Sequence, residues 1–107
     1  MKTSQIDRVR LSSQEIELIK AQIPKVTPQP YNLRLFGSRV DSEIRGGDID
    51  LMLELKGICE NPVVMRSRLA ALVSIALGGR KVDVVIKADN TKALPIHSVA
   101  LAEGVIL

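Results

Sequence analysis

Residues 48–55 alternate apolar and polar side chains more regularly than any other part of the chain. Successive side chains of a β-strand point to opposite faces, so this segment predicts a strand with one apolar and one largely acidic face. The apolar positions are Ile49, Leu51, Leu53 and Leu55, and the alternating positions are Asp48, Asp50, Met52 and Glu54. The aliphatic face requires other elements to cover it, so this strand is expected to lie in a packed sheet.

Other elements follow from turn residues and periodicity. Short apolar runs predict strands over 31–36 and 81–86. Ser12 followed by Glu15 has the form of a capping box and predicts a helix that ends at Pro24. Asn61-Pro62 predicts a second, longer helix that ends near residues 78–79. A short helix is expected over 39–45 and a last one over 95–107, with Ile96, Val99, Ala100 and Ile106 on one side, while residues 1–10 form a loose lead.

These elements predict an α/β (α+β) fold with a small mixed sheet of about four strands and helices mainly on one face. A length of 107 residues suits a single domain, 1–107. The apolar C-terminus, residues 105–107, either covers the sheet or pairs with another chain, because small domains often complete their core by association. A homo-oligomer or hetero-oligomer is therefore expected.

Composition narrows the possible partners. Fifteen basic and twelve acidic residues give a net charge of +3, well short of the dense basic surface of a dedicated nucleic-acid binder. The aromatic side chains are only Tyr31 and Phe36, which disfavours base stacking as a binding mode. The single Cys59 cannot form an internal disulfide, and neither a signal segment nor a membrane span is evident. We therefore expect a cytoplasmic protein without membrane or nucleic-acid partners.

Three aspartates on two predicted strands form the most informative cluster. Asp48 and Asp50 share one face of a strand, roughly 6 to 7 Å apart along it. If the strand of Asp83 pairs beside them, a third carboxylate joins the group. Three carboxylates would repel one another unless a cation compensates their charge. Oxygen ligands of this kind suit Mg²⁺ or Mn²⁺.

Gly37-Ser38 stands where a predicted strand gives way to a predicted helix. Backbone N–H groups at such a turn can face an anion, and glycine allows the close approach that a phosphate needs. Gly-Ser turns are common, so this feature gains weight only beside the two acidic strands.

Together these motifs resemble the minimal nucleotidyltransferases of the DNA polymerase β-like superfamily. The resemblance rests on Leu35-Phe36-Gly37-Ser38-Arg39, on Gly47-Asp48-Ile49-Asp50-Leu51 and on Val82-Asp83-Val84-Val85. It covers about residues 33–86, which would be the catalytic core. Nine residues separate Ser38 from Asp48, one fewer than in the commonest form, and Gly47 replaces a frequent serine.

The resemblance implies an enzyme and assigns roles to the matching residues. Gly37 and Ser38 would bind the β- and γ-phosphates of a nucleoside triphosphate, with Arg39 adding positive charge. Asp48, Asp50 and Asp83 would be the catalytic residues and ligate two divalent ions, and Asp83 would also act as general base. The implied reaction transfers a nucleoside monophosphate, AMP from ATP, to a hydroxyl of a protein, nucleic acid or small molecule.

The resemblance also leaves two alternatives. Standalone members of the superfamily can be antitoxin-type modules that neutralise a HEPN-type helical toxin partner, with or without catalysis. A degenerate domain that binds nucleotide without transfer is a further possibility, which the intact acidic set disfavours.

Other charged residues are given structural interpretations. Glu54 is expected to face solvent, and Arg66 and Arg68 to be solvated helix residues. His97 has no spaced partner and is interpreted as a surface or helix residue that does not serve as a base.

Overall fold

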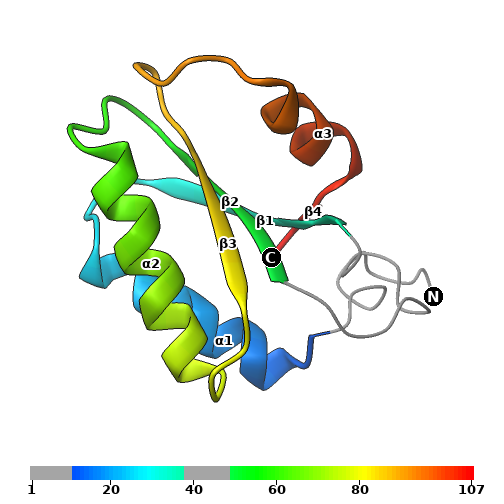
Figure 1. Ribbon diagram of the computed structural model, residues 1–107. Coiled ribbons are helices and arrows are strands. Elements are labelled where there is room, and N and C mark those ends of the chain that lie inside the picture. The colour runs from blue at the N-terminus through cyan, green and yellow to red at the C-terminus, as the bar shows by residue number, and fades with distance from the viewer. Residues whose placement is uncertain (1–10, 38–48) are drawn as a thin grey trace.

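A four-stranded sheet forms the centre of the computed structural model, which describes residues 11–37 and 49–107 (Figure 1). The strands are β1 (Tyr31–Phe36), β2 (Ile49–Leu55), β3 (Val82–Lys87) and β4 (Val105–Ile106), in the spatial order β3-β2-β1-β4. β2 and β3 run parallel, whereas β1 is antiparallel to both β2 and β4. The prediction of a small mixed sheet is therefore confirmed.

Helices lie on both faces of this sheet. They are α1 (Ser13–Gln22), with a 3-10 turn η2 (Ile23–Lys25) after it, α2 (Pro62–Ala76) and α3 (Pro95–Glu103). Figure 1 shows α1 and α2 on one side of the strands and α3 on the other. α2 provides the crossover that a parallel pair such as β2 and β3 requires. Within the described residues, two of the three α-helices share one face, as predicted, and α3 covers part of the other.

The main core lies between the sheet and the α1–α2 layer. Aliphatic side chains of all three elements are almost completely buried there: Ile16 and Ile19 of α1, Leu51 and Leu53 of β2, and Leu69 and Val73 of α2. A second, smaller cluster on the opposite face joins Phe36, Met52 and Ala100, with Val85 against it. The alternation of β2 thus sends its leucines into one core and Met52 into the other.

The element ends agree closely with the turn signals. The capping box is present: the Ser12 hydroxyl accepts the Glu15 N–H at 3.1 Å, and the Ser12 N–H donates to the Glu15 carboxylate at 2.8 Å. The Asn61 side chain accepts the Val64 N–H at the start of α2. Both helix starts are therefore confirmed. The predicted lead over 1–10 and the predicted helix over 39–45 lie outside the described residues.

The end of the chain differs from the prediction. α3 stops at Glu103, and Ile106 is not helical but belongs to β4, which pairs antiparallel with Arg34 and Leu35 of β1. Gly104 separates the two elements with an extended backbone, φ −75° and ψ 159°. Of the two roles left open for the C-terminus, this structure shows coverage of the sheet edge. No helix within 11–37 or 49–107 has the length and apolar character needed to cross a membrane.

Gly104→Ala is expected to destabilise the fold by about 2 kcal/mol. A Cβ at this position would collide with the Ala100 carbonyl oxygen and lie 3.2 Å from the Leu35 carbonyl oxygen. Urea unfolding measures the change in the free energy of unfolding. Ser98→Ala, at an exposed position of the same helix, is the control and should stay within about 0.5 kcal/mol of the native protein. Equal stability of the two variants would contradict the tight junction between α3 and β4.

Candidate functional site

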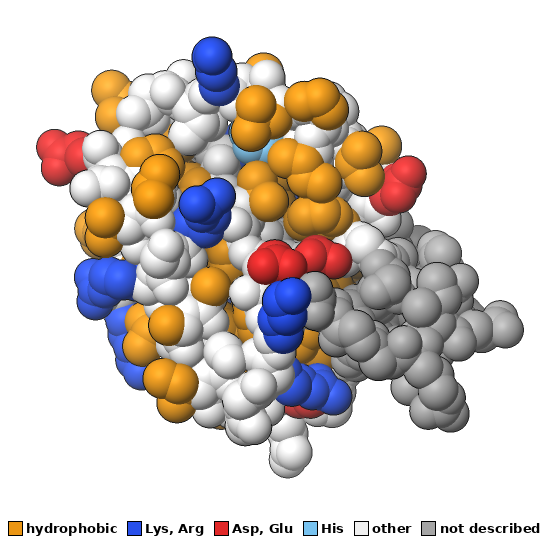
Figure 2. All heavy atoms as spheres, viewed as in Figure 1, with side chains coloured by type: hydrophobic (Ala, Val, Ile, Leu, Met, Phe, Trp, Pro, Cys, Tyr) orange, Lys and Arg blue, Asp and Glu red, His pale blue; other side chains and the backbone are white. Residues whose placement is uncertain are grey.

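Asp50 and Asp83 form an acidic pair on adjacent strands. They are register partners in the parallel pairing of β2 with β3, so their side chains leave the same face of the sheet. That face is opposite the main core, because Leu51 and Val84, their chain neighbours, are buried in the core. Asp50 is half-buried and Asp83 is exposed. Figure 2 shows acidic side chains gathered near the centre of the viewed surface.

Gly37 brings the end of β1 against this pair. Its neighbour Phe36 is the register partner of Asp50, and Gly37 itself has φ +77°, a backbone conformation that favours glycine. A Cβ built on Gly37 would collide with the Asp50 carboxylate oxygen Oδ2. The position therefore excludes a side chain for two independent reasons, and the main chain at Gly37 lies directly beside the Asp50 carboxylate.

The structure thus brings together three of the six predicted site residues: Gly37, Asp50 and Asp83. The other three, Ser38, Arg39 and Asp48, lie outside the described residues. Among the residues that are described, no group of three or more His, Cys, Asp or Glu side chains could hold a metal ion. The predicted three-carboxylate cluster includes Asp48 and stays a prediction.

An apolar wall stands next to the acidic pair on the same face. In the next row of the sheet, Met52 is the register partner of Val85, and α3 packs over this row through Ala100. Met52 is fully buried and Phe36 is 5% exposed. Apolar surroundings of this kind strengthen electrostatic contacts made at the neighbouring carboxylates.

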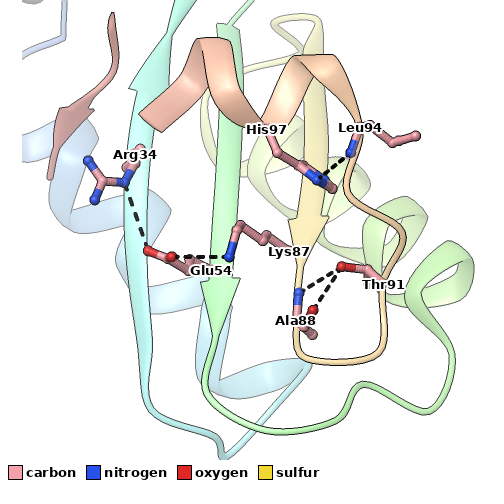
Figure 3. Close-up of polar contacts among 7 residues, drawn as sticks. All are labelled: Arg34, Glu54, Lys87, Ala88, Thr91, Leu94 and His97. Carbon is pink, nitrogen blue, oxygen red and sulfur yellow. Dashed lines mark hydrogen bonds and ion pairs between the residues drawn. The ribbon is translucent and has the colours of Figure 1, made fainter. Parts of the chain in front are cut away.

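Glu54 was predicted to face solvent, but it is only partly exposed. Its carboxylate lies between two cations, with Oε1 3.9 Å from Arg34 Nε and Oε2 3.6 Å from Lys87 Nζ (Figure 3). Its side chain is 25% exposed. The two ion pairs were not predicted, because both cations come from neighbouring strands, and the alternation within β2 does not show which side chains those strands bring beside Glu54. The charge of Glu54 is thereby balanced, and the acidic part of this face is confined to the Asp50 end.

His97 was predicted to be a surface or helix residue. It lies in α3 and is buried. It is 4% exposed, and its Nδ1 accepts the Leu94 N–H at 3.2 Å (Figure 3). Figure 3 shows the imidazole reaching from α3 toward β3. The signal that sequence analysis missed is the Leu94-Pro95 helix start, where a side chain two residues after the proline can fold back onto the preceding backbone.

Comparison with solved structures finds a crystal structure of a Sulfolobus solfataricus protein, described provisionally as a nucleotidyltransferase, that is similar to this chain. The match has a TM-score of 0.51, covers 99% of this chain and 87% of that chain, and shows 22% sequence identity. The chain has a nucleotidyltransferase-type fold. No protein-family profile matches the sequence, and the search of curated proteins finds no similar sequence. The predicted nucleotidyltransferase-type fold is confirmed, and the minimal subtype stays a prediction.

Proposed function

We propose that this chain is a divalent-metal-dependent nucleotidyltransferase that transfers AMP from ATP to a hydroxyl acceptor, with a partner protein among the candidate acceptors. The observation that carries the proposal is the arrangement of Gly37, just after β1, beside Asp50 of β2, which is in register with Asp83 of β3. It combines a main-chain segment without a side chain, as a phosphate requires, with two carboxylates on one face.

The carboxylate oxygens of Asp50 and Asp83 fit Mg²⁺ or Mn²⁺. Asp50 and Asp83 offer hard oxygen donors on adjacent strands, the type of ligand that these divalent ions prefer. Asp48, two residues before Asp50, is proposed as the third ligand. When bound, the metal would neutralise charge on the phosphates and orient them.

Phosphate binding and proton transfer are proposed for residues of the chain. Gly37 and Ser38 are proposed to bind the β- and γ-phosphates, and Arg39 to add a positive charge. Asp83 is the more exposed carboxylate of the described pair, so it is proposed to accept the proton of the acceptor hydroxyl. The buried Phe36 and Met52 beside the pair would limit water at the site.

A second candidate function is an antitoxin-type module that neutralises a HEPN-type helical partner, with or without catalysis. It is favoured by the apolar outer surface of α3, where Ile96, Val99 and Leu101 are 37 to 40% exposed. Figure 2 shows hydrophobic side chains gathered on this part of the surface, next to the acidic ones. Apolar residues on adjacent turns of one helix are typical of a surface that binds another protein.

Radiolabel transfer tests the proposed reaction. The native chain is incubated with Mg²⁺, candidate acceptors including any co-purified protein, and ATP labelled at either the α- or the γ-phosphate. Label from the α-phosphate should enter a product, whereas label from the γ-phosphate should leave with pyrophosphate. Transfer of the γ-label would indicate a kinase and contradict the proposal. Neutralisation of a helical partner without transfer of either label would favour the second candidate.

A further inference from the structure

A pocket of about 410 Å³ lies between the start of α2, β3 and the start of α3. Its lining includes Arg66 of α2, Val85 of β3, Lys92 of the β3–α3 loop, and Leu94, Ile96 and His97 at the start of α3. The segments that form it are distant in the sequence and meet only in the folded chain. The nucleotide and metal roles proposed above do not use this pocket, and the proposed partner-binding surface of α3 shares only Ile96 with it among its named residues.

The aliphatic and basic side chains that line the pocket fit an anion with an apolar body. Val85, Leu94 and Ile96 supply aliphatic surface, and Arg66 and Lys92 supply two positive charges. No Asp or Glu is among the lining residues in the described part of the chain. A carboxylate or phosphate can therefore approach both cations without a competing negative charge in the wall.

His97 adds a directed polar group to this lining. Its ring is almost completely buried, and Nδ1 is occupied by the Leu94 N–H. In a neutral imidazole that accepts at Nδ1, the proton is carried by Nε2. The ring nitrogen that remains can thus donate a hydrogen bond to an oxygen of a bound molecule.

The position of the pocket relative to the acidic pair indicates its role. Val85 follows Asp83 by two residues on the same face of β3, which places it roughly 6 to 7 Å further along the strand. Gly37 lies on the opposite side of Asp50, at the end of β1. If pyrophosphate leaves on the Gly37 side, an in-line displacement brings the attacking oxygen from the β3 side, where the pocket lies.

We infer that this pocket binds the acceptor, and that the acceptor is a hydroxyl compound with an apolar body and a carboxylate or phosphate group. The role of the pocket as an acceptor site rests on the proposed nucleotidyl transfer. The chemistry of its ligand rests only on the residues that line it. In that reaction the acceptor oxygen bonds to the α-phosphorus, the bond from that phosphorus to pyrophosphate breaks, and the hydroxyl proton passes to Asp83. Arg66, interpreted from sequence as a solvated residue, becomes a ligand-binding residue.

A matched pair of probes tests the pocket by heteronuclear NMR of the full chain, without metal or nucleotide. The probes are ω-hydroxyoctanoate and the octanediol with hydroxyls at both ends, which differ mainly in charge. The carboxylate should shift the amides of residues 63–66, 90–94 and 96–97 and bind roughly fivefold more tightly than the diol, as two weak charge contacts would provide. Arg66→Gln with Lys92→Gln should remove this preference, and Arg68→Gln, which lies outside the pocket lining, should retain it.

Two results would overturn the inference. Equal affinity for the two probes, or shifts confined to other residues, would exclude an anion pocket here. Magnesium–ATP that shifts the same amides and displaces the carboxylate would assign the pocket to the nucleoside and not to the acceptor. Failure of the proposed function is distinguishable, because Asp50→Asn would then lack an effect on ATP binding while probe binding at Arg66 and Lys92 persists.

Discussion

Asp50→Asn is expected to lower the rate of AMP transfer by at least about 100-fold. The change keeps the size of the side chain and removes one of the charges proposed to hold the metal. Its position at the junction of β1, β2 and β3 makes compensation by another described carboxylate difficult, since Glu54 is held by Arg34 and Lys87. The rate is measured with ATP labelled at the α-phosphate.

Glu54→Gln is the matched control for this variant. It removes a carboxylate from the same strand and the same face, but at the end that carries the ion pairs. We expect transfer to stay within about threefold of the native rate, with stability lowered by no more than about 1 kcal/mol. Equal losses of transfer in the two variants would contradict a specific role for Asp50.

Gly37→Ala is expected to lower transfer by at least about tenfold, with weaker binding of ATP. The new Cβ would collide with the Asp50 carboxylate and displace it from Asp83, in addition to the cost of an L-residue at φ +77°. Calorimetric titration with magnesium–ATP measures the affinity, and the α-label assay measures the rate.

Gly78→Ala separates the cost of a positive φ from the collision with the Asp50 carboxylate. Gly78 has nearly the same backbone angle, φ +78°, but a Cβ at this position would meet no atom within 4 Å beyond its chain neighbours. This variant should lose about 1 kcal/mol of stability and keep native transfer. If Gly78→Ala reduced transfer as strongly as Gly37→Ala, backbone strain and not contact with Asp50 would explain the effect.

Local signals predicted most of the fold. The alternation of residues 49–55, the Ser12–Glu15 capping box and the Asn61-Pro62 helix start each act within a few residues, so their outcome was visible in the sequence. The two-residue strand β4 was not predictable in this way. Its pairing with β1 joins residues about seventy positions apart, and two residues are too few to show a period of two.

The closeness of Asp50 and Asp83 also follows from local patterns. The alternation of β2 placed Asp50 on the face opposite the core, and the parallel pairing with β3 then brought Asp83 beside it. The contacts of Glu54 and the burial of His97 depend on neighbouring strands and on how α3 covers the sheet. Sequence alone gives no distance between such elements, and for that reason the pocket beside β3 was not predicted.

We propose that Asp50 and Asp83 hold a divalent cation beside the main chain at Gly37. Paramagnetic broadening by Mn²⁺ in heteronuclear NMR spectra, with a non-hydrolysable ATP analogue present, locates this cation. Amide signals at Gly37, at residues 49–51 and at residues 82–84 should disappear first, and Asp50→Asn with Asp83→Asn should prevent this loss. Broadening centred elsewhere, or unchanged broadening in the double variant, would contradict a cation site at Asp50 and Asp83.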